Sequence, residues 1–301
     1  MQANILKVES ISQIHDFMGF EKPKHPLVTV VNFGEIEELP KLPKDTKIVS
    51  SFYFIALKSG LTSPIKYGRG YYDFQEGTLY AMAPEQVMTV EHEAKEEMEG
   101  WGLYFHPDLI RQYPLNEKIK GYGFFSYENN EALHLSDKEK VTITSVIEKI
   151  VEEYEANIDE FSQDVLVANI DLLLSYIQRY YSRQFITRKT QNSDVLMRFE
   201  SLMREYFGTK LKNGLPLVSY FAEQLNLSAS YLSDLLKKET GKTAQEHIHY
   251  QIIEKAKNLL LNSNATVSEI SYDLGFEYPQ YFSKIFKKKT GVSPLEFRTL
   301  N

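Results

Sequence analysis

Two segments near the C-terminal end of the chain carry hydroxyl, amide, carboxylate and lysine side chains at corresponding positions, fifty residues apart. The first set is Ser230, Ser233, Asp234, Lys237 and Lys238, and the second set is Gln280, Ser283, Lys284, Lys287 and Lys288. A glutamine can bond to N6 and N7 of adenine, a lysine can reach O6 and N7 of guanine, and an aspartate can accept from N4 of cytosine. Lysines can also contact phosphates. These residue types therefore suit contact with DNA, provided that each set lies on the exposed side of one element.

The two segments belong to an internal repeat, which predicts two copies of one supersecondary unit. Residues 231–241 and 281–291 are apolar at matching positions, and the match continues upstream at an offset of 49 residues. Each copy predicts a short helix, a tight turn and a second helix. Asn226 and Gly275 fall at the two turns, and both residue types adopt a left-handed backbone at low cost. Such a unit is a helix-turn-helix, whose second helix can enter the major groove of DNA.

The second helix of each copy must pack one side inward and leave the opposite side exposed. Its apolar spacing predicts an inward set of Leu232, Leu235, Leu236, Phe282, Ile285 and Phe286. Tyr231 and Tyr281 are interpreted as packing residues rather than DNA contacts. For Asp234, an ion pair with Lys237 or Lys238 one turn further on is an equally good interpretation. Capping boxes are predicted at Thr243/Glu246, Thr266/Glu269 and Ser293/Glu296.

A helix over 243–262 is predicted between the copies, and about 20 residues make a rod of roughly 30 Å. That length is close to the ~34 Å between successive major-groove faces of DNA. The pair Gly275-Phe276 and the ending Gly291-Val-Ser-Pro-Leu-Glu-Phe-Arg298 resemble the signature of the AraC/XylS family of bacterial transcription regulators. The resemblance covers the C-terminal third of the chain. It departs from the family at Ile252, where many members carry an arginine.

The resemblance implies a sequence-specific DNA-binding transcription regulator, and the two outward sets match positions with which the family contacts bases and phosphates. The implied partners are double-stranded promoter DNA, RNA polymerase, a small-molecule effector and a second copy of the chain. Activation is commoner in the family than repression. The alternative is a helical protein-interaction scaffold that does not bind DNA, and the lysine clusters argue against it.

The distribution of charge separates the chain into two parts, although its net charge is −7. Residues 188–301 carry 16 Lys and Arg against 12 Asp and Glu, a net charge of +4, whereas the residues before them carry −11. An acidic regulatory part followed by a mildly basic part fits a DNA-binding regulator.

Short runs rich in Val, Ile, Phe and Tyr predict a β domain between Pro26 and His106. The clearest strands are Leu27–Phe33, Lys47–Ala56, Gly77–Pro84 and Gly100–Phe105. They suggest an antiparallel sandwich or small barrel, which resembles the cupin-like sensor domain that precedes many AraC-type DNA-binding domains. Tyr53, Tyr67 and Tyr71 could line an effector pocket, or they are simply core residues. Residues 1–25 show no clear pattern.

Two amphipathic helices, from Ser136 to about Ala156 and from Ser162 to Phe185, predict a helical hairpin. The hairpin either mediates dimerisation, as in the family, or covers an open face of the sheet. Residues 186–193 are polar and are predicted as a linker, followed by a helix from Asp194 to Phe207. The predicted fold class is α+β. The cupin-like domain with its hairpin (136–185) spans 1–185, and an all-α double helix-turn-helix domain spans 194–301.

The sequence argues against an enzyme, including a cupin-type metal enzyme. It contains no cysteine, which excludes disulfides and thiolate chemistry. Metal-binding cupins use a His-x-His pair, a nearby Glu and a later His, whereas the histidines of the N-terminal part stand alone. His92 is the nearest candidate, and His247 and His249 lie on different sides of a helix. We therefore predict no catalytic residues, no metal and no cofactor.

No apolar run approaches the ~20 residues that a membrane-spanning helix needs. The N-terminus also lacks a basic start followed by an apolar core and a cleavage site. A cytoplasmic protein without a membrane partner is therefore expected.

Overall fold

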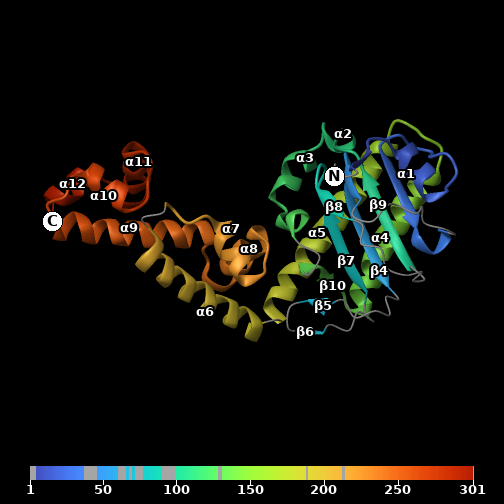
Figure 1. Cartoon of the computed structure of the whole chain (residues 1–301). Coiled ribbons are helices and arrows are strands. Elements are labelled where there is room, and N and C mark those ends of the chain that lie inside the picture. Colours follow the sequence, from blue (N-terminus) through green and yellow to red (C-terminus); the bar gives the residue numbers. More distant parts are fainter. Residues whose placement is uncertain are drawn as a thin grey trace. The chain divides into compact units, whose positions relative to one another are not determined.

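The computed structural model describes residues 5–36, 46–59, 66–67, 70–71, 77–89, 99–127, 131–187, 189–211 and 214–300. The chain forms two compact units, Met1–Thr187 and Arg188–Asn301 (Figure 1). The boundary falls within the predicted linker, 186–193, and the described residues of this range are helical. Helix α5 (Ser162–Thr187) ends in it, and α6 (Lys189–Glu205) begins in it, earlier than the predicted start at Asp194. Polarity alone does not interrupt a helix where glycine and proline are lacking.

The first unit is built on a five-stranded antiparallel sheet with the strand order β10-β7-β4-β9-β2. Its strands are β2 (Val28–Asn32), β4 (Tyr53–Ser59), β7 (Thr78–Met82), β9 (Glu99–Phe105) and β10 (Leu133–His134). In the central strand, Ile55 lies opposite Ala81 on one side and Leu103 on the other. Because side chains alternate along a strand, Ile55 and Leu57 point to one face of the sheet, and Phe54, Ala56 and Lys58 point to the other.

A second, three-stranded sheet contains β1 (Ile5–Val8), β3 (Lys47–Ser50) and β8 (Val87–Thr89), and β5 (Lys66–Tyr67) pairs with β6 (Gly70–Tyr71). One expectation was wrong here. The strand predicted over Lys47–Ala56 is interrupted at Ser51–Phe52, and its halves, β3 and β4, belong to different sheets. The described strand pairs within 26–106 are antiparallel as predicted, and β1, which precedes this region, adds a parallel pair with β3. A run of apolar residues does not show where a strand changes its partner.

Residues 1–25 contain structure that the sequence analysis missed. Helix α1 (Ile11–Met18) begins with a capping box formed by Ser10 and Gln13, and Gly19 ends it in a left-handed conformation, φ 76°. A capping-box pair followed by apolar residues and a glycine indicates a short helix. Helix α1 buries Ile11 and Ile14 against Phe52.

The predicted helical hairpin is α4 (Asp137–Glu155) and α5, which pack against each other. Helix α4 also contacts β2, and α5 contacts β10, so the hairpin covers part of the main sheet. Between β9 and β10 the chain forms α2 (Pro107–Ile110), α3 (Leu115–Lys118) and two 3-10 turns, Ile119–Gly121 and Gly123–Ser126.

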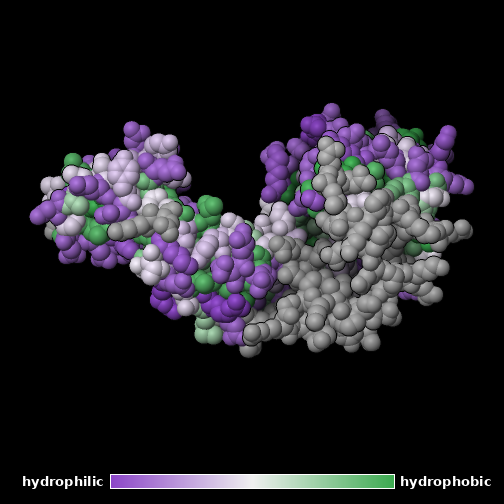
Figure 2. All heavy atoms as spheres, in the orientation of Figure 1, coloured by the Kyte–Doolittle hydropathy of each residue, from purple (hydrophilic) through white to green (hydrophobic). Residues whose placement is uncertain are grey.

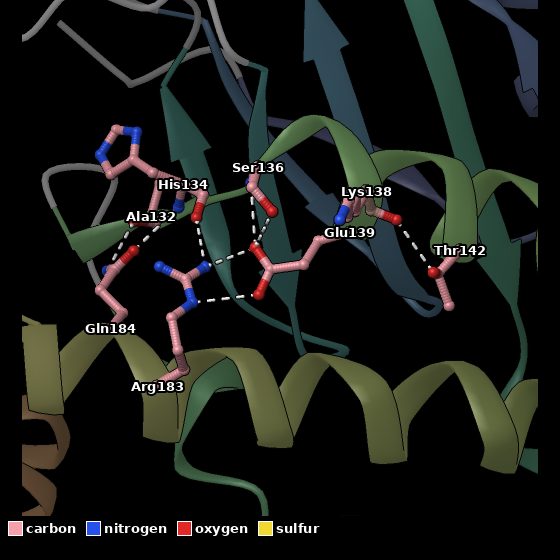
Figure 3. A network of polar contacts seen from close by, with 8 residues as sticks. All are labelled: Ala132, His134, Ser136, Lys138, Glu139, Thr142, Arg183 and Gln184. Carbon is pink, nitrogen blue, oxygen red and sulfur yellow. Dashed lines mark hydrogen bonds and ion pairs between the residues drawn. The ribbon is translucent and has the colours of Figure 1, made fainter.

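A polar network joins the last turns of α5 to β10 and the start of α4 (Figure 3). The guanidinium of Arg183 donates to both carboxylate oxygens of Glu139, at 3.0 and 2.7 Å, and to the carbonyl of His134 at 2.8 Å. The side-chain amide of Gln184 accepts from the His134 backbone N–H at 2.9 Å and donates to the Ala132 carbonyl at 3.2 Å. The helix that ends at the unit boundary is therefore tied to the edge strand of the sheet.

The second unit is all helical, as predicted. After α6 come a π-helix (Tyr206–Lys210), α7 (Val218–Leu225), α8 (Ala229–Thr240), α9 (Ala244–Asn262), α10 (Val267–Asp273), α11 (Pro279–Thr290) and α12 (Pro294–Leu300). The α+β fold class is thus confirmed. Within the described ranges, no helix is long and apolar enough to span a membrane.

Candidate nucleic-acid interface

The two predicted helix-turn-helix units are α7–α8 and α10–α11, and their turns have the same hydrogen bonds. In the first, Asn226 adopts φ 55°, its N–H donates to Glu223 O at 3.1 Å, and the Leu227 N–H donates to Ala222 O at 2.9 Å. In the second, Gly275 adopts φ 82°, and the N–H groups of residues 275 and 276 donate to the carbonyls of residues 272 and 271 at 2.9 and 3.0 Å. The left-handed turns predicted from Asn226 and Gly275 are confirmed.

Local capping sets the ends of the neighbouring helices. The capping boxes of Thr243 with Glu246 and Thr266 with Glu269 are formed, which confirms both predictions. At the start of α12 the Ser293 N–H donates to the Glu296 carboxylate at 2.7 Å, and the Glu296 N–H donates to Ser293 Oγ at 3.3 Å. These bonds to the carboxylates lower the pKa of the three glutamates.

The second helices, α8 and α11, are called the recognition helices below. Their predicted inward residues are all buried: Leu232, Leu235, Leu236, Phe282, Ile285 and Phe286. The two tyrosines differ. Tyr231 is 5% exposed and packs as predicted, whereas Tyr281 is 56% exposed, so its interpretation as a packing residue was wrong. Its ring contacts the ring of Phe276 in an edge-to-face arrangement, with 6.1 Å between centroids. Spacing places a tyrosine near a core but does not decide how far its polar end lies in solvent.

The outward sets differ between the two helices. On α11, Gln280, Lys284, Lys287 and Lys288 are exposed and Ser283 is half-buried. On α8, Lys237 and Lys238 are exposed, whereas Ser230, Ser233 and Asp234 are half-buried. The ion pair of Asp234 with Lys237 or Lys238 stays a prediction. The view in Figure 2 shows a mostly hydrophilic surface over this unit with scattered apolar residues.

Tyr278 and Tyr281 are candidate contact residues that the sequence analysis did not assign. Tyr278 is the N-cap residue of α11, is 67% exposed, and its side chain makes no capping hydrogen bond. The N-terminal residues of a recognition helix are those that approach base edges. The position of both tyrosines directly after the turn at Gly275-Phe276 was the signal that could have identified them.

Positive charge gathers at the C-terminal ends of both recognition helices. Lys237 and Lys238 lie in the last turn of α8, and Lys287, Lys288 and Lys289 lie in the last turn of α11, where they also complement the helix dipole. Charges of Lys289 and Lys237 both act on the Glu246 carboxylate at the start of α9, and Lys289 and Lys288 act on His249. Burial, followed by these lysines, lowers the pKa of His249. Each recognition helix therefore ends in a cluster of lysines.

Helix α9 connects the two helix-turn-helix units and packs against helices of both. Its 19 residues correspond to about 28 Å. Ile252, the position at which the chain departs from the family resemblance, is buried and packs into the core. Arg298 of α12 donates from Nε to the Leu260 carbonyl at 2.9 Å and so caps the end of α9. This bond gives the arginine of the C-terminal signature a structural role.

Of the three tyrosines predicted to bind an effector, the structure describes the side chain of Tyr53. Tyr53 stacks on Phe105 and packs against Phe125, with 5.0 Å between centroids in each case, and burial raises its pKa. Tyr67 and Tyr71 lie in the short paired strands β5 and β6, and their side chains are outside the described residues. The contacts of Tyr53 are those of a core residue.

The other face of the main sheet carries a different set of groups. Phe54 stacks on Tyr104 at 4.4 Å, and both pack with Phe33 near Gly102. Lys58 follows on the same face of β4, and its ammonium lies 5.7 Å from the centroid of the Phe33 ring. Burial lowers the pKa of Lys58. Within the described part of the chain, this ammonium forms no ion pair or hydrogen bond.

The histidines have separate environments. His15 is buried in α1 and is hydrogen-bonded to Thr29 Oγ1 at 2.9 Å, and His106 accepts from the Asp108 N–H at 3.2 Å. His247 and His249 both belong to α9 but have different partners: His247 is hydrogen-bonded to Thr240 of α8, and His249 is hydrogen-bonded to Gln245 of α9. His92 lies outside the described residues. Among the residues that are described, no three His, Asp or Glu side chains are placed to hold a metal ion.

The family model that matches this chain lies in the second unit. Residues 221–299 match the model of a helix-turn-helix domain family. The xylose operon regulatory protein of Escherichia coli strain K12 is 34% identical over 84 residues, which are 28% of this chain and 21% of that protein. The transcriptional activator RhaS of E. coli O139:H28 is 38% identical over 77 residues, which are 26% of this chain and 28% of that protein.

Among solved structures, the C-terminal domain of AraT, a response regulator from Geobacillus stearothermophilus, is 33% identical. The match covers 34% of this chain and 85% of that domain, with a TM-score of 0.31. The chain spans only about a fifth of the length of the xylose regulator that it matches, 21%.

Proposed function

We propose that this chain, whose C-terminal unit is a helix-turn-helix domain of the AraC/XylS type, binds specific sequences in double-stranded promoter DNA and regulates transcription. The observation that carries the proposal is the pair of matching helix-turn-helix units at the two ends of α9. The ~28 Å length of α9 suits two recognition helices in adjacent major-groove faces, which are about 34 Å apart. Such a protein acts where the DNA is, which for a bacterial regulator is the cytoplasm.

Helix α11 is proposed as the principal base-contacting helix. Gln280 and Lys284 are exposed and lie four residues apart, which places them one turn apart on the same side of the helix. An amide suits adenine and an ammonium suits guanine in the major groove. Tyr278 and Tyr281 stand beside them at the N-terminal end, where their rings can contact the methyl group of thymine and their hydroxyls can contact phosphate. Ser283 completes this outward set.

Helix α8 is proposed to contribute phosphate contacts more than base contacts. Ser230, Ser233 and Asp234 are half-buried in the free protein, and a carboxylate is repelled by phosphates unless it meets a cytosine amino group. Lys237 and Lys238 are exposed, and with Lys287 and Lys288 of α11 they supply charge for the DNA backbone. Phosphate contacts of this kind position the protein without specifying sequence.

Selection of binding sites from random DNA by the full-length protein, at two salt concentrations, tests the proposal. We expect an enriched motif with two half-sites about one helical turn apart, and retention that falls as salt rises because counterions are released on binding. Salt-sensitive retention without a motif would contradict sequence specificity. Absence of retention at low salt would contradict DNA binding itself and favour the interaction-scaffold alternative.

Control by a small molecule is the second part of the proposal, and Lys58 supports it. A half-buried ammonium without a carboxylate partner is costly, and a ligand carboxylate would remove that cost. Phe33, Phe54 and Tyr104 offer aromatic surface next to it. We therefore place the effector's anionic group at Lys58, on the sheet face opposite to the one to which Tyr53 belongs. The effector class is a small carboxylate with an aromatic or apolar body.

Thermal unfolding of the full chain with a panel of aromatic carboxylates and their uncharged amides tests this site. A ligand should raise the melting temperature of the wild-type protein but not of Lys58→Met, and its amide should have little effect. Lys138→Met is the matched control, because Lys138 is exposed at the start of α4. Equal stabilisation of wild type and Lys58→Met would contradict the assignment.

Dimerisation through the helical hairpin is the third part, and it is supported by apolar residues that the fold leaves exposed. On α5, Val165 and Leu172 are 40% and 43% exposed and lie seven residues apart on one side of the helix. Ile158 and Phe161, just before α5, are 69% and 61% exposed. The proposed output is activation through contact with RNA polymerase, in keeping with the relative RhaS, which is described as a transcriptional activator.

A further inference from the structure

The two turns of the helix-turn-helix units use different residues for the same conformation. Asn226 and Gly275 both have a left-handed backbone, at φ 55° and 82°, and both turns form the same two hydrogen bonds. In the first helix-turn-helix unit an asparagine adopts this conformation. The conformation by itself therefore does not explain why the second helix-turn-helix unit has a glycine at this position.

A close backbone contact does explain it. A β-carbon at residue 275 would lie 2.7 Å from both the carbonyl carbon of Gly214 and the carbonyl oxygen of Leu211, and 3.0 Å from Gly214 Cα. All three are main-chain atoms, which cannot rotate away as the end of a side chain can. Gly214 itself has φ 120°, which side-chain-bearing residues rarely adopt. Two glycines thus bring two backbones together.

The segment that meets Gly275 belongs to the first half of the unit. It follows the π-helix at the end of α6, and α6 packs against α7 and α8. The hydroxyl of Tyr206 donates to the Gly214 carbonyl at 3.1 Å, and Lys255 of α9 donates to the Phe207 carbonyl at 2.6 Å. Leu211 is buried. Gly214 is therefore held by Tyr206 of the π-helix, and the π-helix is in turn held by Lys255 of α9.

The contact provides a second connection between two halves that α9 already joins covalently. A single helix between two small bodies allows bending and twisting about its axis, whereas a second contact away from the axis restricts both. We infer that the Gly275–Gly214 contact fixes the relative position of the recognition helices α8 and α11, and that it thereby sets the spacing of DNA half-sites that the protein accepts. The second clause rests on the proposed DNA-binding function, and the first does not. Gly275 is thus a positioning residue that touches no DNA.

The geometric part can be tested without DNA, because the chain has no cysteine. Spin labels at Lys238→Cys on α8 and Lys288→Cys on α11 report the distance between the recognition helices by pulsed electron resonance. We expect a single narrow distance distribution, which Gly275→Asn broadens at least twofold. This substitution installs the residue that the first turn uses, so it keeps the left-handed conformation and adds only the clashing β-carbon. Asn226→Gly is the matched control and should leave the width unchanged.

The functional part is tested with duplexes that carry the selected site with its spacer shortened or lengthened by one base pair. One base pair changes the relation of the half-sites by about 35° and about 3.4 Å. We expect the wild-type protein and Asn226→Gly to bind the original spacing at least tenfold more tightly than either altered spacing. Gly275→Asn should lose most of this preference while it binds the isolated α11 half-site with unchanged affinity.

The outcomes separate the inference from the function. A folded Gly275→Asn with an unbroadened distance distribution and full spacer preference would overturn the inference. If Gly275→Asn does not fold, the variants Tyr206→Phe and Lys255→Met decide. The first removes the hydrogen bond to the Gly214 carbonyl, the second removes the hydrogen bond from α9 to the preceding π-helix, and neither adds bulk at Gly275. Unchanged distributions in both would also overturn it. A wild-type protein that binds no duplex would refute the proposed function and the spacing clause, and the spin-label result would still decide the geometric clause.

Discussion

Replacement of Gln280 and Lys284 together by alanine tests whether α11 contacts bases. Both side chains are exposed, while Phe282 and Phe286 on the inward side are fully buried, so the truncation removes no packing. Alanine also has the highest helix propensity, and we expect the free energy of unfolding to change by less than about 0.5 kcal/mol. A well-oriented contact to a base is worth about 1–3 kcal/mol. The pair should therefore weaken specific binding by roughly 2–5 kcal/mol, or about 30- to 5,000-fold.

The assay is fluorescence anisotropy with the selected site and with random DNA of equal length, at two salt concentrations. Loss confined to the selected site indicates base contacts. An equal loss of affinity for the selected site and for random DNA, with a slope of log affinity against log salt concentration that is smaller by about one, would mean that Lys284 contacts phosphate. Lys257→Ala on α9 is the control, because it removes one positive charge away from α11, where Lys257 pairs with Glu254 at 2.8 Å. Unchanged affinity of the double variant for its site would refute the assignment of α11.

Three further predictions concern stability and assembly. Arg183→Ala should lower the free energy of unfolding of the first unit by about 1–3 kcal/mol, because it removes an ion pair with two hydrogen bonds to Glu139, whose side chain is 15% exposed. An unchanged midpoint of urea unfolding would show that the network of Figure 3 is not stabilising. The capping bonds lower the pKa of Glu246, Glu269 and Glu296 from 4.5, so the stabilisation that they provide is complete above pH 4.5 and is lost as the pH falls through the lowered pKa values. The helical signal of the protein in urea should therefore fall over this pH range, and Glu296→Gln should make the fall smaller. Leu172→Glu should make the full chain monomeric in light scattering without unfolding it, and a persistent dimer would move the interface away from α5.

Much of the second unit could be predicted because its determinants are local. The left-handed turns depend on Asn226 and Gly275, and the helix starts depend on pairs such as Thr243 and Glu246, which are three residues apart. The inward residues of α8 and α11 follow from a period of about 3.6 residues. The same locality explains the missed helix α1, whose capping box at Ser10 and Gln13 was present in the sequence. Residues a few positions apart contain this information in full.

The first unit was less predictable, because its sheet is made by distant segments. The run 47–56 reads as one strand, yet β3 pairs with β1 and β8, while β4 pairs with β7 and β9. The same pairing decides on which face each side chain lies. It placed Tyr53 among Phe105 and Phe125, and it placed Lys58 beside Phe33 on the opposite face. Alternation along one strand defines two faces but does not say what covers each.

The sequence by itself determined that this protein has two helix-turn-helix units, where each turns, and which residues form their cores. Only the tertiary structure decided that Tyr231 is buried and Tyr281 exposed, although the two occupy the same position of the repeat. It also decided that Gly275 meets the backbone of residues 211 and 214, which are more than sixty residues away in the sequence. The physical reason is the range of the interactions: turns and caps are set by neighbours along the chain, whereas exposure and close approach depend on which distant segment arrives at the same place.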